Sequence, residues 1–172
     1  MLATNVTGVL LTTFAFIELL DEGNKRNVEK KLPSSQLVTT GSAGGFARQE
    51  HFIYNASKAA VTHMMKCLAT TLVPWGIRSN IIAPGCKSIP PPGGGQALTV
   101  TVFLSQITSG WHDEIEASGK TVPKNLVPEE RFGTEEEMAG TILYLASKAG
   151  GYCNGNVLLV DGGTLSVVPS TY

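Results

Sequence analysis

Tyr54-Asn55-Ala56-Ser57-Lys58 opens the most regular helical pattern of the chain, which runs from Tyr54 to about Val73. Tyr54 and Lys58 are four residues apart, so on a helix they share one face, one turn apart. A phenol has a pKa of about 10, and an ammonium group beside it favours the phenolate. The spacing therefore predicts an acid–base pair, although a surface pair on an exposed helix face has the same spacing. Apolar residues along the same helix predict a broad packing surface: Val61, Met64, Met65, Leu68 and Leu72.

Three short apolar segments surround this helix, and each ends in residues typical of a turn. Gln36–Gly41 leads into Ser42 and a glycine-rich turn, Ile77–Ala83 ends in Pro84-Gly85, and Asn156–Val160 ends in Asp161-Gly162-Gly163. Strands that alternate with helices pair in parallel through right-handed crossovers. The predicted fold is α/β, a partial doubly wound (Rossmann-like) parallel sheet of three strands with flanking helices.

Two further helices are expected to flank the sheet. Residues 4 to about 22 carry one helical stripe (Val6, Val9, Leu10, Phe14 and Ile17) and a second apolar face (Leu11, Phe16 and Leu19), so we expect cover on both sides. Asn24–Lys31 is interpreted as a solvated helix end or loop. The last helix begins with a capping box at Thr134-Glu135-Glu136-Glu137. We expect Met138, Ile142 and Leu145 to be its buried stripe and Gly150-Gly151 to end it.

These segments together resemble the short-chain dehydrogenase/reductase family. That family carries a serine, Tyr-x-x-x-Lys, Pro-Gly and a late Asp-Gly-Gly in the order found here, and Asn5-Val6-Thr7-Gly8 is similar to its catalytic-asparagine segment. The resemblance covers residues 1–172 as a single domain, apart from residues 86–128. That segment, with its Pro90-Pro91-Pro92 run, is expected to be an irregular insert where the family has its substrate lid. Within it, Val100–Ile107 is apolar enough for a short buried element.

The resemblance implies NAD or NADP as cofactor and a small-molecule carbonyl or alcohol as substrate. It implies that Tyr54 exchanges the proton, that Lys58 lowers the pKa of that phenol and holds the nicotinamide ribose, and that Ser42 hydrogen-bonds the substrate oxygen. It also implies that Asn5 holds a relay water and that Pro84 and Gly85 form a wall beside the nicotinamide. Ser88 would hold the nicotinamide amide. Ser42 lies twelve residues before Tyr54, where many members have thirteen, and Ser88 is one residue short of the usual hydroxyl.

The glycine motif that receives a dinucleotide pyrophosphate is missing from the sequence. Gly41-Ser42-Ala43-Gly44-Gly45 follows a strand but fits neither family spacing, and Met1 lies essentially at the catalytic-asparagine helix. We therefore expect a truncated domain that binds NAD(P) weakly by itself. Two functions remain open: an NAD(P)-dependent oxidoreductase, and a catalytically inactive fragment that serves as an oligomerisation or interaction module.

Composition restricts the partners. Hydrophobic residues make up 42% and charged residues 16% of 172 residues, and the net charge of -1 favours neither nucleic acid nor an anionic membrane. The apolar run Gly8–Leu20 is too short to span a bilayer and contains Glu18. Cys67, Cys86 and Cys153 lack a Cys-x-x-Cys spacing, which favours free thiols in a reducing compartment. We expect a cytoplasmic protein that forms a homo-oligomer through an open sheet edge at Gln36–Gly41.

Overall fold

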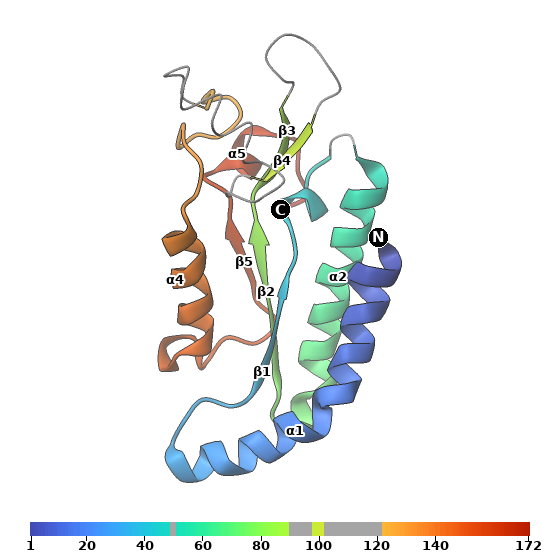
Figure 1. The fold of residues 1–172 in the computed structure, drawn as a ribbon, viewed down its shortest axis with the longest axis vertical. Coiled ribbons are helices and arrows are strands. Elements are labelled where there is room, and N and C mark those ends of the chain that lie inside the picture. The colour runs from blue at the N-terminus through green and yellow to red at the C-terminus, as the bar shows by residue number, and fades with distance from the viewer. Residues whose placement is uncertain (49–50, 90–97, 102–121) are drawn as a thin grey trace.

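The computed structural model describes residues 1–48, 51–89, 98–101 and 122–172, and its centre is a three-stranded parallel sheet (Figure 1). The strand order is β1 (Gln36–Thr40), β2 (Arg78–Pro84) and β5 (Val157–Val160). Gln36 pairs with Arg78 at one end of the β1–β2 ladder, and Ile81 pairs with Val157 in the β2–β5 ladder. The predicted α/β fold with three parallel strands is confirmed.

Helices cover both faces of this sheet (Figure 1). One face carries α1 (Val9–Lys30), which continues the π-helical turn η1 (Ala3–Gly8), and α2 (Phe52–Thr71). The other face carries α4 (Glu135–Ala146). Short turns complete the described elements: η2 (Ala43–Gly45), η3 (Val73–Trp75), η4 (Lys148–Gly150) and α5 (Thr164–Val167).

The main core lies between the sheet and the two helices α1 and α2. Its buried members are Val61, Met65, Leu68, Leu72, Ile77 and Ile81, and α1 adds the partly buried Val6, Val9, Leu10, Ile17 and Leu20. β2 is buried from Arg78 to Ala83 because it is the central strand and has helices on both sides. A strand with no face in water is stabilised by apolar burial, which explains the run Ile81-Ile82-Ala83.

Arg78 ties together the amino ends of the strands. Its guanidinium donates to neutral oxygens only: the hydroxyl and carbonyl of Ser34, the side-chain oxygen of Gln36, and the carbonyls of Gly150 and Cys153, all at 3.0–3.2 Å. Burial lowers the pKa of Arg78. Because a buried cation requires hydrogen-bonding partners, this cluster fixes the loops before β1, β2 and β5 relative to one another.

The first helix is longer than expected: it continues to Lys30, so the predicted end near residue 22 is wrong. Lys31 then takes a left-handed conformation (φ 52°) and the amide of Leu32 bonds the carbonyl of Asn27 at 2.9 Å, a C-terminal capping arrangement. The basic residues of Asn24–Lys31 are exposed, as expected for a solvated helix end. By length and composition alone, Ala3–Lys30 could cross a membrane, and a core helix can pass the same test.

One face of α1 packs on the core, but its other face is not covered by any element that the structure describes. Phe14, expected on the buried stripe, is 53% exposed. Leu11, Phe16 and Leu19 are also exposed, so the expected cover on both sides is wrong for the chain as described. The sequence therefore identified two apolar faces on this helix, and the described residues cover only one of them.

The last helix begins as predicted and ends earlier. Both hydrogen bonds of the capping box join Thr134 and Glu137. Leu145 is fully buried, but Ile142 is 47% exposed, which corrects its predicted place in the core. The helix stops at Ala146 and not at Gly150-Gly151. Gly150 lies in the following turn, where a Cβ would stand 2.4 Å from the Tyr144 carbonyl oxygen, so only glycine permits this close return of the chain.

Part of the 86–128 segment, which was expected to be an irregular insert with one short element, forms regular structure. β3 (Cys86–Ile89) and β4 (Leu98–Thr101) form an antiparallel pair. The short buried element expected at Val100–Ile107 overlaps β4, and its residues 102–107 lie outside the described residues, as does most of the proposed lid (90–97 and 102–121). Val122 and Val127 are buried in a small separate cluster with Leu126 and Phe132.

Two glycine-to-alanine changes test the packing. A Cβ on Gly45 would lie 2.9 Å from the Lys58 carbonyl carbon and 3.0 Å from the Ala59 amide nitrogen, both backbone atoms of α2. Gly45→Ala should therefore lower the free energy of unfolding by about 1–3 kcal/mol in urea denaturation. Gly140→Ala, in the exposed part of α4 with nothing within 4 Å of the new Cβ, should raise it by about 0.5–1 kcal/mol. Equal effects of the two changes would contradict this packing.

Candidate active site

Polar and glycine residues gather at the carboxyl ends of the three strands, which parallel pairing brings to the same end of the sheet (Figure 1). Ser42 follows β1, Pro84-Gly85 ends β2, and Asp161 follows β5. In open α/β sheets this end is where ligands bind. The candidate active site therefore lies where the fold class places such sites.

Ser42 is fixed by the turn that it begins. It is 2% exposed, and its Oγ accepts a hydrogen bond from the Gly44 amide at 3.0 Å, so it caps η2. Accepting this bond leaves the hydroxyl hydrogen of Ser42 able to donate to another oxygen. The serine is thus held in one orientation before any substrate arrives.

Tyr54 and Lys58 lie in the first two turns of α2, and both are half-buried. The Lys58 Nζ lies 5.9 Å from the centre of the Tyr54 ring and donates to the Thr40 carbonyl at 3.2 Å. The ammonium group therefore joins α2 to the end of β1 and stands close to the phenol. A cation at this distance from the centroid of an aromatic ring is attracted to the face of that ring.

Gly44 brings Ser42 and Tyr54 together. A Cβ on this glycine would lie 3.1 Å from Cε1 of the Tyr54 ring, 3.2 Å from the Ser42 Oγ and 2.9 Å from the Asn55 side-chain oxygen. The three side chains therefore border the same backbone position. Sequence reasoning missed this role of Gly44; the available signal was a pair of glycines between the serine and the tyrosine.

Asn5 reaches the same helix from the π-helical turn η1. Its side-chain amide donates to the Ser57 Oγ at 3.0 Å, and Ser57 donates to the Tyr54 carbonyl at 2.8 Å. Ser57 is fully buried and was not singled out from the sequence. Asn5 thus lies next to the turn that carries Tyr54 and Lys58, and its service to a relay water stays a prediction.

The residues expected beside the nicotinamide are only partly described. Gly85 is buried, and its amide bonds the Val160 carbonyl at 2.8 Å, so Pro84 and Gly85 extend the β2–β5 ladder to its end. The backbone of Ser88 lies in β3 opposite Thr99. The Ser88 side chain lies outside the described part, and so does that of Cys86.

The Asp-Gly-Gly segment forms a structural turn. The Asp161 carboxylate accepts from the amides of Gly163 (2.9 Å) and Leu165 (2.8 Å), which starts α5 directly after β5. Gly162 and Gly163 have φ values of 58° and 82°, which favour glycine. This turn directs the chain after β5 back toward the serine turn.

The glycines after β1 do not form a phosphate site. Gly44 is covered by the Tyr54 ring and Gly45 by the backbone of Lys58, so both serve the close approach of α2. Tyr54 and Lys58 are half-buried donors, which is the chemistry that the ribose hydroxyls of a nicotinamide cofactor would require. No turn between a strand and a helix N-terminus among residues 1–48, 51–89, 98–101 and 122–172 shows the glycine spacing that holds a pyrophosphate.

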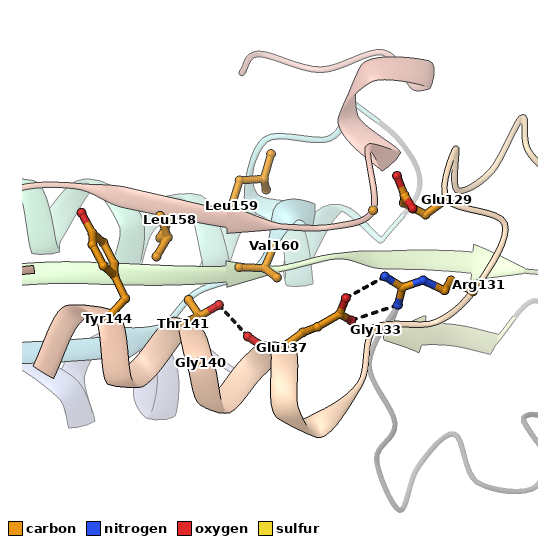
Figure 2. A pocket seen from close by; sticks show the side chains of 11 residues that line it. Glu129, Arg131, Gly133, Glu137, Gly140, Thr141, Tyr144, Leu158, Leu159 and Val160 are labelled. Carbon is orange, nitrogen blue, oxygen red and sulfur yellow. Dashed lines mark hydrogen bonds and ion pairs between the residues drawn. The ribbon is translucent and has the colours of Figure 1, made fainter. Parts of the chain in front are cut away.

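A cavity of about 720 Å³ lies between α4 and β5, on the face of the sheet opposite α2 (Figure 2). At its mouth, Arg131 pairs with both carboxylate oxygens of Glu137, at 2.6 and 3.0 Å. The hydrogen bond from Arg131, together with the one from the Thr134 amide, lowers the pKa of Glu137 to about 2. The cavity is lined by neither Ser42, Tyr54 nor Lys58, so it is separate from the candidate active site.

The side chains that commonly bind metals are dispersed in the described part of the chain. None of the described His, Cys, Asp and Glu side chains form a group of three or more that could hold a metal ion. Cys67 is an exposed free thiol, and the free Cys153 lies 3.2 Å from the Tyr144 hydroxyl. Both are outside the site formed by Ser42, Tyr54 and Lys58.

Comparisons with known proteins show which family the sequence resembles. The family model described as short chain dehydrogenase matches residues 1–90, just over half of the 172 residues. The chain is 48% identical over 185 residues to the short-chain dehydrogenase/reductase VdtF of Byssochlamys spectabilis, covering 98% of this chain and 54% of the relative. It is 31% identical over 166 residues to a cyclohexanol dehydrogenase of Rhodococcus sp. (strain TK6), covering 95% and 51%.

Among solved structures, the Pseudomonas aeruginosa RhlG/NADP active-site complex superposes with a TM-score of 0.73 at 28% identity, covering 95% of this chain and 57% of that one. The chain therefore spans about half the length of the relatives that it matches. The structural neighbour has the same arrangement of a parallel sheet with flanking helices. The chain belongs to the short-chain dehydrogenase/reductase family.

Proposed function

We propose that this chain, as one domain, carries the proton-transfer end of an NAD(P)-dependent oxidoreductase that reduces a small carbonyl compound or oxidises the alcohol. The observation that carries the proposal is the common border of the Ser42 hydroxyl and the Tyr54 ring at Gly44, with the Lys58 ammonium 5.9 Å from the ring centre. Family membership and an NADP complex of a structural neighbour support the choice of cofactor class.

In this mechanism the bound nicotinamide supplies or accepts the hydride. Tyr54 gives a proton to the carbonyl oxygen of the substrate, or takes it from the alcohol. Lys58 stabilises the phenolate that remains, and its position is held by the Thr40 carbonyl. Ser42 donates its hydroxyl hydrogen to the same substrate oxygen. The bond from the Gly44 amide uses a lone pair of the Oγ and leaves this hydrogen available.

Asn5, Pro84, Gly85 and Ser88 have supporting roles in the proposal. Asn5 supports the first turns of α2 through Ser57 and holds a water that links Lys58 to solvent, while Pro84 and Gly85 form a wall beside the nicotinamide. The Ser88 hydroxyl holds the nicotinamide amide. We place this reaction in the cytoplasm.

A second candidate function rests on the open edge of β1. A groove of about 560 Å³ runs between α1 and β1, and none of its lining residues is charged: Thr4, Gly8, Val9, Thr12, Thr13, Phe16, Leu20, Leu37, Val38 and Thr39. The amide of Gly41 and the carbonyl of Ser35 bond to β2. The N–H and C=O groups of successive strand residues point to opposite sides. Those of Gln36, Val38 and Thr40 therefore point away from β2, toward the outer edge of β1.

We propose that this edge and groove take a second copy of the chain, because an uncharged surface of this kind is compatible with its own copy. In this alternative the chain acts as an oligomerisation module without catalysis. The groove and the Ser42–Tyr54 border share no lining residue, so a substitution in the groove tests assembly without changing that border.

The acid–base assignment is tested by Tyr54→Phe, which removes the exchangeable proton and keeps the ring against Gly44. Turnover of a panel of small ketones and aldehydes, measured with millimolar NADH or NADPH, should fall at least about 100-fold. Tyr152→Phe is the matched control, because that ring is fully exposed and lies outside the site. Near-normal turnover in Tyr54→Phe would remove this residue from the mechanism.

The 172-residue chain should bind NAD(P)H weakly by itself. Tyr54 and Lys58 offer hydrogen bonds of about 1–3 kcal/mol each, whereas micromolar binding requires about 8 kcal/mol. A fluorescence titration with NADH and with NADPH should therefore show no saturation below about 100 µM. The expected Kd is about 1 mM. Saturation at low micromolar concentration would reveal a phosphate site that these contacts do not explain.

Light scattering at micromolar concentration tests the edge. The wild type should be a dimer or larger, and Val38→Lys should shift it toward monomer, because a charge on an edge strand opposes pairing. Val28→Lys is the control: Val28 is 79% exposed on α1 and does not line the groove. A monomeric wild type, or equal effects of both lysines, would count against the proposed surface.

A further inference from the structure

The residues that follow α5 lie beside the serine turn and pair with it. Ala47 and Ser170 form an isolated antiparallel bridge. The Arg48 amide donates to the Pro169 carbonyl at 2.8 Å, and the Thr171 amide donates to the Phe46 carbonyl at 2.9 Å. Residues 169–172 are therefore bonded to 46–48 as a short two-stranded ribbon, which we call the strap.

Side chains reinforce these backbone bonds. The rings of Phe46 and Tyr172 meet edge to face, with centroids 5.2 Å apart and planes at 76°. The Thr171 hydroxyl donates to the Phe46 carbonyl at 3.2 Å, so this carbonyl accepts twice from one residue. Edge-to-face packing is a favoured geometry of aromatic pairs, and it selects one position of the Phe46 ring.

The strap connects the segment after β5 to the turn after β1. On one side, the Ser170 hydroxyl donates to the Leu165 carbonyl at 3.4 Å in α5, which the Asp161 carboxylate holds directly after β5. On the other side, Phe46 ends the η2 turn that Ser42 begins. The chain end therefore lies beside the loop after β1, at the carboxyl ends of the strands (Figure 1).

The contact between the strap and Phe46 affects the η2 turn because of where Phe46 lies in the chain. Phe46 directly follows Gly44 and Gly45, which pack against the Tyr54 ring and the Lys58 backbone. Gly45 also donates to the Ser42 carbonyl at 3.0 Å. A shift of Phe46 would therefore move the η2 turn, whose Gly44 lies between the Ser42 hydroxyl and the Tyr54 ring.

We propose that the strap is a positioning element of the active site: Thr171 and Tyr172 hold Phe46, and through it the η2 turn, so that Ser42 and Tyr54 face one substrate oxygen. The catalytic consequence rests on the proposed oxidoreductase function. The contact itself does not, and it can be measured without turnover.

The first experiment measures amide hydrogen exchange by NMR in Tyr172→Ala. Exchange at Gly44, Gly45 and Arg48 should become at least about fivefold faster, whereas the Ile81 amide, bonded to Asn156 in the sheet, should keep its rate. Tyr172→Phe retains the ring and should match the wild type. Tyr152→Ala, at a fully exposed tyrosine, is the control for loss of an aromatic side chain.

Two results of this experiment would overturn the proposal. Unchanged exchange at Gly44 and Gly45 in Tyr172→Ala would show that the strap does not hold the turn, provided that the double variant Thr171→Val/Tyr172→Ala gives the same result. An equal increase at Ile81 would show loss of global stability in place of local positioning.

The second experiment separates kcat from KM. In Tyr172→Ala, kcat should fall about tenfold with the KM for NAD(P)H unchanged, and Tyr172→Phe should restore it. A change in KM alone would contradict a positioning role. If the wild type shows no turnover, the proposed function fails, and the exchange rates at Gly44 and Gly45 still decide whether the strap holds the turn.

Discussion

The parallel pairing of β2 with both neighbours is the constraint on which the rest of the structure depends. β2 is buried from Arg78 to Ala83 and is covered on one side by α2 and on the other by α4. Because all three strands point the same way, Ser42, Gly85 and Asp161 arrive at one end of the sheet. The buried Arg78 cluster fixes the opposite end. The candidate chemistry is thus a consequence of strand direction.

A second constraint is the absence of side chains at Gly44 and Gly45. These residues let α2 approach the serine turn so closely that the Tyr54 ring and the Lys58 backbone touch it. The same contact explains why this glycine-rich turn offers no room for a pyrophosphate. In the proposed mechanism this short segment serves proton transfer.

Much of this structure was predictable from the sequence, because strand ends, helical periods and caps are local signals. The three strands, α2 and the Thr134 capping box appear where the pattern placed them. Phe14 and Ile142 were predicted as buried because periodicity marks an apolar face without showing what covers it. The β3–β4 pair was hidden by the proline and glycine run between its strands. Spacing likewise could not reveal that Asn5 bonds Ser57, since a hydrogen-bond partner 52 residues away depends on tertiary packing.

The central claim is that the fold itself brings the Tyr54 ring to the serine turn, whatever cofactor and substrate it serves. The most direct measurement is an isotope-edited nuclear Overhauser experiment on the ligand-free protein, with labelled tyrosine rings and glycine α-carbons. The structure predicts a strong cross-peak between the Tyr54 ring and the α-protons of Gly44, since Cε1 would lie 3.1 Å from a Cβ at that glycine. A Tyr54 ring with no cross-peak to Gly44, in a protein whose β2 amides remain protected, would contradict the account.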